Sequence, residues 1–126
     1  MRALVIDDSK AMRIILRGVL KQAGFTEVLE AENGRLGLEL LRANPSVDCV
    51  LVDWYMPEMD GRTFIRTVRA DSAFDALPVV MVTSESDAGN MASALLAGAS
   101  EYVIKPFTKD AIVEKLQILG LAGTCA

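Results

Sequence analysis

The chain has 126 residues, enough for one domain that buries about two-thirds of its unfolded surface without disulfides or metals. Although 52% of the residues are apolar, no apolar run approaches the ~20 residues that span a bilayer. The net charge is −4 and the lysines and arginines are scattered, so the basic stripe typical of nucleic-acid-binding proteins is missing. The sequence has no histidine, which excludes a histidine-based triad, a histidine metal site and a phosphohistidine carrier.

The cysteines and the first residues indicate the compartment. Cys49 lies in an apolar segment and Cys125 near the end of the chain, a separation that favours two reduced thiols. Because a strand is expected to begin within three residues of Met1, we expect no signal peptide. We therefore expect a cytoplasmic protein with no nucleic-acid partner and no membrane insertion.

Five short apolar segments alternate with segments of helical periodicity. The expected strands are 3–6, 28–31, 49–52, 79–82 and 102–104. Strands that are apolar on both faces are typical of parallel sheets covered by helices, so this alternation predicts an α/β fold with a parallel sheet. Glu27 and Glu30 place charges along the second segment, which indicates an edge strand.

Polar residues and glycines mark the ends of the expected helices. N-caps of the first three helices are expected at Ser9, Asn33 and Asp60, and the fifth helix starts at Thr108. Ends of helices are expected at Gly24, Asn44-Pro45 and Gly120. The residues expected to face the core are Met12, Leu16, Val19, Leu20, Ala23, Leu36, Leu40, Leu41, Phe64, Ile65, Val68, Met91, Ala94, Leu95, Gly98, Ile112, Leu116 and Leu119. Residues 1–120 then form one domain, and 121–126 form a C-terminal tail.

Three aspartates follow two of the expected strands. Asp7 and Asp8 come after the first strand, and Asp53 comes after the third. Carboxyl ends of parallel strands point the same way, so the three carboxylates would share one rim of the sheet. Close carboxylates repel each other by roughly 4 kcal/mol per pair at an effective dielectric constant near 20, a cost that a bound cation removes. Oxygen ligands alone favour a hard ion, and room for water and phosphate favours Mg²⁺ over Ca²⁺.

Thr83 and Lys105 end two further strands. Lys105 precedes a proline, where the chain must turn, so its ammonium could pair with a carboxylate or a phosphate oxygen. The Thr83 hydroxyl could donate to a phosphate oxygen. Together with Mg²⁺, these residues suit phosphoryl transfer onto a carboxylate, with Asp53 as the nucleophile.

Each of these residues also has a purely structural interpretation. Asp7 and Asp8 could be solvated loop residues, one of them supporting a helix N-terminus. Thr83 could simply close a strand, as β-branched residues often do. Lys105 could be an ordinary surface lysine at a strand end.

Four segments, 5–9, 53–61, 81–85 and 102–107, resemble the receiver domains of two-component response regulators. The resemblance extends over essentially the whole chain, and the motifs follow the family's order. Within the family, segments 69–71, 76–79 and 97–100 are most similar to the stand-alone chemotaxis regulators. The resemblance implies a flavodoxin-like (βα)5 three-layer sandwich with a five-stranded parallel sheet of order 2-1-3-4-5.

The family resemblance also implies a phosphorylation site. Asp53 would accept a phosphoryl group from a sensor histidine kinase, and Thr83 and Lys105 would contact that group. The residues implied to hold Mg²⁺ are Asp7, Asp8, Asp53 and the backbone carbonyl of Tyr55. The peptide between Lys105 and Pro106 would be cis, which an X-Pro bond tolerates.

A switch and its partners follow from the same resemblance. Thr83 would move toward the phosphoryl group and the Tyr102 ring would turn into the vacated space, although Tyr102 could instead merely cover an edge strand. The fourth helix, fifth strand and fifth helix would then bind a downstream protein, such as a flagellar motor switch component. A phosphatase is a further implied partner, and the protein itself would catalyse only its own phosphorylation and dephosphorylation. The alternative is a phosphorelay or stress-signalling regulator with a non-motor partner.

Several positions depart from the chemotaxis pattern. Tyr55 stands where those proteins have an amide side chain, whereas Glu85 matches their acid, and both positions bear on the lifetime of the phosphoryl group. The fourth helix begins at 87–90 without the lysines found there, whereas Lys115 matches a basic position of the fifth helix. Trp54 either packs or partly covers the site, and its fluorescence is expected to report Mg²⁺ binding.

Two other classes use related architecture. A haloacid-dehalogenase-like phosphatase has a strand-end aspartate and Mg²⁺, but it would need a second aspartate where this chain has Tyr55. A flavodoxin-like flavin binder would need a hydroxyl- and glycine-rich phosphate loop after the first strand. The acidic segment 7–10 would repel that phosphate, so both classes are disfavoured.

Overall fold

The computed structural model describes residues 1–84, 88–105 and 107–121. The expectations for Glu85, Asp87, Pro106 and Cys125 lie outside the described residues, as do those for the side chains of Met91 and Ala94. Across the described ranges, no helix is both long enough and apolar enough to cross a membrane.

The strands form one parallel sheet, as expected. They are β1 (Arg2–Ile6), β2 (Glu27–Ala31), β3 (Cys49–Asp53), β4 (Val79–Ser84) and β5 (Glu101–Lys105). Their order is β2-β1-β3-β4-β5, which confirms the flavodoxin-like arrangement and the edge position of β2. Three strands extend further at their carboxyl ends than predicted, so Asp53, Thr83 and Lys105 belong to the last residues of strands instead of following them.

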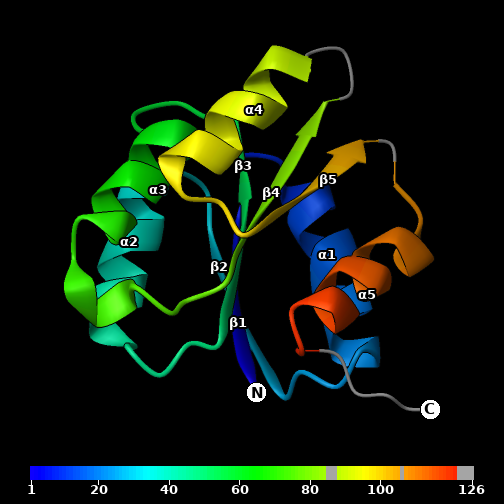
Figure 1. Cartoon of the computed structure of the whole chain (residues 1–126). Coiled ribbons are helices and arrows are strands. Elements are labelled where there is room, and N and C mark those ends of the chain that lie inside the picture. Colours follow the sequence, from blue (N-terminus) through cyan, green and yellow to red (C-terminus); the bar gives the residue numbers. More distant parts are fainter. Residues whose placement is uncertain (85–87, 106, 122–126) are drawn as a thin grey trace.

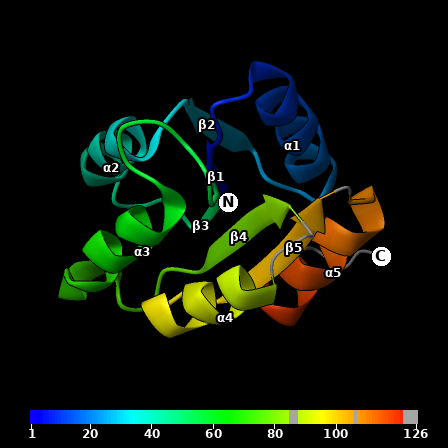
Figure 2. The ribbon, with the colours of Figure 1, turned by 90° about the horizontal axis from the view of Figure 1, so that it is seen from above.

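Helices cover both faces of the sheet. They are α1 (Lys10–Gln22), α2 (Gly34–Ala43), α3 (Gly61–Arg69), α4 (Ala88–Ala97) and α5 (Lys109–Ile118), with a short 3₁₀ turn, η1 (Ser72–Phe74), that we did not predict. Figure 1 and the view from above in Figure 2 show α2, α3 and α4 on one face and α1 and α5 on the other. The domain is therefore the expected three-layer sandwich.

Local side-chain chemistry sets the helix ends. The three expected N-caps are confirmed, and the Thr108 side chain caps α5: in each case the side-chain oxygen accepts a hydrogen bond from the backbone N–H three residues on. Gly24 and Gly120 follow the ends of α1 and α5 with φ of +109° and +74°, the left-handed conformation that glycine adopts without a steric cost.

Alternate side chains of the strands point to opposite faces of the sheet and pack into two separate hydrophobic cores. Leu4 and Ile6 of β1 pack with α2 and α3, whereas Ala3 and Val5 pack with α1 and α5. Cys49 is fully buried at the start of β3, and burial raises the pKa of its thiol to about 12. The predicted buried thiol is therefore a packing residue at neutral pH.

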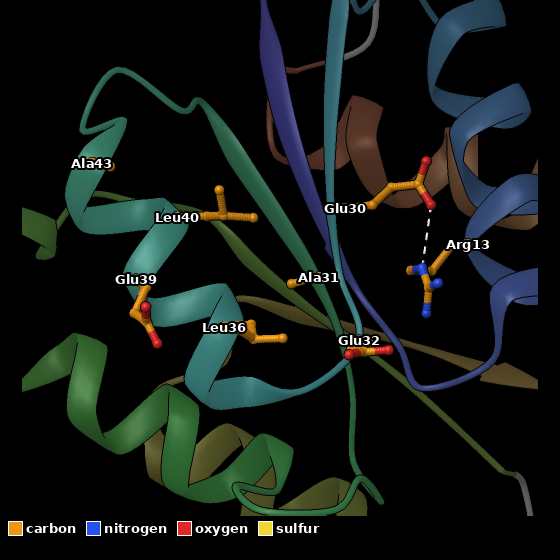
Figure 3. Close-up of a pocket in the computed structure, with 8 residues that line it drawn as sticks. All are labelled: Arg13, Glu30, Ala31, Glu32, Leu36, Glu39, Leu40 and Ala43. Carbon is orange, nitrogen blue, oxygen red and sulfur yellow. Dashed lines mark hydrogen bonds and ion pairs between the residues drawn. The ribbon is translucent and has the colours of Figure 1, made fainter.

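The predicted core residues of α2 and α4 differ in burial. In α2, Leu38, which we did not predict, is buried, while Leu36 and Leu40 are partly buried and pack against the core beside the sheet edge. Those two leucines line an open groove of about 600 Å³ between α2 and β2, shown in Figure 3. Leu95 of α4 is 46% exposed. Most residues of this helix are small or apolar, so its sequence does not indicate which face is buried.

Candidate functional site

The candidate residues lie along one rim of the sheet. Asp7 directly follows β1, Asp53 ends β3, Thr83 is the penultimate residue of β4, and Lys105 ends β5. These four strands are consecutive neighbours in the sheet. The register pairs Asp53 with Val82, so Asp53 and Thr83 stand at nearly the same height on adjacent strands. Parallel pairing thus brings together residues that are far apart in the sequence.

The three aspartates form a compact acidic cluster. Asp7, Asp8 and Asp53 each offer a carboxylate oxygen, and these oxygens lie within 4.8 Å of one another. Asp7 and Asp53 are 1% and 8% exposed, whereas Asp8 is exposed at the opening of the cluster. One oxygen of Asp7 accepts a hydrogen bond from the Ser9 N–H (2.9 Å), and one of Asp53 accepts from the Trp54 N–H (2.8 Å). A carboxylate oxygen has more than one lone pair, so the cluster can still offer ligand atoms to a cation.

Lys105, at the end of the edge strand β5, contributes a positive charge to the site. Its Nζ lies 3.3 Å from Asp7 Oδ2 and 3.5 Å from Asp53 Oδ1. The lysine is therefore not an ordinary surface residue, because one ammonium faces two largely buried carboxylates.

Asp53 is the perturbed carboxyl group of the cluster. Burial is the largest cause and raises the pKa of Asp53 to about 6. The Lys105 ammonium and the hydrogen bond from the Trp54 N–H lower this pKa, whereas the nearby carboxylates of Asp7 and, to a smaller extent, Asp8 raise it. The single ammonium thus does not compensate for burial and for the two neighbouring carboxylates. A divalent cation at the cluster would favour the ionised form of Asp53 that a nucleophile requires.

Thr83 contributes an unused hydrogen-bonding group. Its side chain is 1% exposed, and its Oγ1 is buried without a hydrogen-bond partner among the residues that the structure describes. Buried polar atoms are normally paired, so an unpaired one calls for an explanation. A ligand with oxygen acceptors at the rim would provide the missing partner.

The donor set fits Mg²⁺. All the ligand atoms of the cluster are carboxylate oxygens, the type that Mg²⁺ prefers, and exposed Asp8 leaves one side open to water and to a phosphate oxygen. The backbone carbonyl of Tyr55 as a further ligand stays a prediction; the Tyr55 side chain is 59% exposed.

The loop between β3 and α3 packs tightly against the acceptor strand. The Gly61 N–H donates to the Trp54 carbonyl (2.9 Å), which brings the start of α3 against the end of β3. The Trp54 side chain is 7% exposed and belongs to the core, which confirms the packing interpretation. Glu58 adopts a φ of +65°, rare for a non-glycine residue, and its carboxylate accepts from Asn33 Nδ2 (2.7 Å).

Sequence reasoning missed Arg13 at this site. Its Nη1 donates to the backbone carbonyl of Asp7 (2.6 Å), and its Nε donates to Glu30 on β2 (3.2 Å). The sequence around Arg13 does not indicate these contacts, because they depend on how α1 packs beside β2 at the sheet edge.

Tyr102, the predicted switch residue, lies outside the acidic cluster. It is partly buried on β5, where it packs against the core on the α2, α3 and α4 side. Lys115 Nζ of α5 lies 5.2 Å from the centre of its ring and 3.4 Å from the carboxylate of Glu101. Tyr102 and Lys115 therefore join β5 to α5 on the surface that the family resemblance assigns to partner binding.

Comparisons with known proteins agree with the fold and identify the family. Residues 3–117 match the response regulator receiver domain. Chemotaxis protein CheY1 of Helicobacter pylori is 41% identical over 119 residues, 94% of this chain and 96% of that protein. The chemotaxis protein CheY homolog of Campylobacter jejuni is also 41% identical, over 95% of this chain and 93% of its own. The solved structure of chemotaxis response regulator CheY4 of Vibrio cholerae has a TM-score of 0.85 at 30% identity, covering 94% of this chain and 97% of that one. The chain therefore belongs to the response regulator receiver domain family.

Proposed function

We propose that this protein is a cytoplasmic phosphoacceptor of a two-component system, in which Asp53 receives a phosphoryl group from a sensor histidine kinase. The observation that carries the proposal is the position of Lys105 Nζ, within 3.5 Å of oxygens of both Asp7 and Asp53. An ammonium there can neutralise an oxygen of an incoming phosphoryl group. The kinase would supply the donor histidine, since these 126 residues include none.

The chain's residues have distinct parts in this reaction. An Asp53 carboxylate oxygen attacks phosphorus, the bond from phosphorus to the kinase imidazole nitrogen breaks, and an aspartyl phosphate forms. Lys105 and the Thr83 hydroxyl donate to the phosphoryl oxygens. Mg²⁺, held by Asp7, Asp8, Asp53 and the Tyr55 carbonyl, would supply positive charge to the oxygens of the transferring group. The protein thus catalyses its own phosphorylation and later hydrolysis, and acts as a regulator.

We further propose that the phosphorylated protein acts in chemotaxis, as its relatives' names indicate for them. Its target would be a protein such as a flagellar motor switch component, bound to α4, β5 and α5. Among the described side chains of α4 and α5, Leu95 (46%), Leu96 (89%) and Ile118 (61%) are large, apolar and exposed. These two helices flank β5 (Figure 2), and exposed apolar side chains there would be available to a protein partner.

Intact-mass measurement tests the phosphoacceptor. Wild-type protein incubated with a small phosphodonor and MgCl₂ is expected to gain a single phosphate, and EDTA should suppress the gain. Asp53→Asn should stay unlabelled, because an amide lacks the nucleophilic oxygen. An unchanged wild-type mass, or a labelled Asp53→Asn protein, would contradict the assignment.

Removing the Tyr102 ring is expected to weaken partner binding without changing phosphorylation. Tyr102→Ala is expected to be labelled at the wild-type rate, since the ring lies outside the acidic cluster, but to bind the motor-switch partner about tenfold more weakly, as loss of an aromatic interface residue commonly does. The affinities of the phosphorylated proteins are compared by calorimetry, with Tyr102→Phe as the control that keeps the ring. Wild-type affinity in Tyr102→Ala would count against the switch.

A further inference from the structure

One guanidinium connects the acidic cluster to the edge of the sheet. Arg13 lies in the second turn of α1, and its side chain points back toward the helix start, where helical side chains lean. It donates to the Asp7 carbonyl at 2.6 Å and to Glu30 Oε1 at 3.2 Å, and it is 14% exposed. Figure 3 shows Arg13 and Glu30 facing each other between α1 and β2.

The carbonyl that Arg13 holds belongs to the peptide between two of the clustered aspartates. The Asp7 N–H donates to the Ala31 carbonyl (3.1 Å), and the Asp7 carboxylate accepts from the Ser9 N–H (2.9 Å). The hydrogen bond from Arg13 to the Asp7 carbonyl is the third contact that holds Asp7. Because a trans peptide is planar, fixing the direction of the Asp7 carbonyl also fixes the amide from which Asp8 starts.

Asp8 depends on that peptide more than its two neighbours do. The Asp7 and Asp53 side chains are largely buried, and Lys105 and backbone N–H groups hold their oxygens. Asp8 is exposed at the opening of the cluster, although its carboxylate lies within 4.8 Å of the other two. Its distance from them therefore depends on the direction of its backbone as well as on its own side-chain rotamer.

We propose that Arg13 is a positioning residue of the metal site: by holding the Asp7 carbonyl against β2, it sets where the Asp8 carboxylate stands. The inference rests on the proposed Mg²⁺-dependent function and adds a residue that does not touch the ion. Residues that orient the ligands of a metal commonly change its affinity when they are replaced.

A neighbouring arginine provides a matched control. Arg17, one turn further along α1, also pairs with Glu30 (3.5 Å), but its side chain is 53% exposed and this ion pair does not involve Asp7. Arg17→Gln therefore removes a cation from Glu30 and leaves the Asp7 carbonyl held. If Arg13 served only to attach α1 to β2, the two substitutions would have similar effects on the metal site.

The test is titration with MgCl₂ alone, followed by the fluorescence of Trp54, the only tryptophan of the sequence. Arg13→Gln is expected to raise the Kd for Mg²⁺ about tenfold, whereas Arg17→Gln should stay within about twofold of wild type. Arg13→Lys keeps the charge but has one nitrogen in place of a fork, so its Kd should remain at least about threefold above wild type. It also serves as the second variant should Arg13→Gln fail to fold.

Labelling by a small phosphodonor adds a second readout. In Arg13→Gln the Mg²⁺ concentration for half-maximal labelling should rise in step with the Kd, while the rate at saturating Mg²⁺ returns to the wild-type value. A wild-type Kd in Arg13→Gln, equal weakening by Arg17→Gln, or full recovery by Arg13→Lys would overturn the inference alone. A wild-type protein that binds no Mg²⁺ would reject the proposed function, and the inference with it.

Discussion

Gly61→Ala is expected to lower the free energy of unfolding by roughly 1–3 kcal/mol, the usual cost of forcing an extra carbon into a packed site. A Cβ at position 61 would stand 2.3 Å from the Asp53 carbonyl oxygen and 3.0 Å from the Trp54 Cα. Both neighbours are backbone atoms at the end of β3, so no side chain can rotate to make room. Urea denaturation measures the effect.

Gly18 is the matched control for this substitution. It lies on the exposed face of α1, and a Cβ there would meet no atom within 4 Å. Gly18→Ala should therefore raise the free energy of unfolding by roughly 0.5–1 kcal/mol, because alanine favours a helix. A Gly61→Ala protein as stable as wild type would mean that the start of α3 does not abut the acceptor strand as described.

Asp53→Asn is expected to stabilise the metal-free protein at neutral pH. Folding raises the pKa of Asp53 from 3.8 to about 6, so the folded state holds this proton more tightly than the unfolded state does. As the pH rises from about 4 to about 6, ionisation of Asp53 therefore lowers the stability of the wild type and not that of the variant. A shift of this size corresponds to roughly 1–3 kcal/mol above about pH 6.

Urea denaturation of wild type and Asp53→Asn in EDTA, from about pH 4 to above pH 6, measures how the difference in their free energies of unfolding changes with pH. The advantage of Asp53→Asn should be negligible near pH 4, grow up to about pH 6 and stay constant above it. Adding MgCl₂ at pH 8 should narrow the difference, because a cation relieves the carboxylate repulsion in the wild type. An advantage that shrinks as the pH rises would refute the electrostatic account of the cluster.

Much of this architecture could be predicted because the signals are local or periodic. A single polar side chain decides a helix start, as at Asn33, and strands apolar on both faces indicate a sheet covered on both sides. The strand order came from the family resemblance, since periodicity does not say which strands are neighbours. Prediction failed for Leu95, which is 46% exposed, and missed buried Leu38, because whether an apolar side chain is covered depends on which elements pack beside it.

The convergence of the site followed from one rule, that parallel strands end on the same side. That rule sufficed for Asp7, Asp53 and Lys105, because each stands at the carboxyl end of a strand. It could not reveal the contacts of Arg13, which depend on the approach of α1 to β2. Nor could it show the left-handed backbone of Glu58, which no glycine in the sequence marks.

The central claim is that the phosphoryl group is carried by Asp53, and locating that group tests it most directly. Borohydride reduction of the labelled protein converts a phosphorylated aspartate to homoserine, which peptide mass spectrometry assigns to one position. Conversion is expected at Asp53 and not at Asp7, Asp8 or Asp60. Conversion at any of those three, with Asp53 unmodified, would contradict the account.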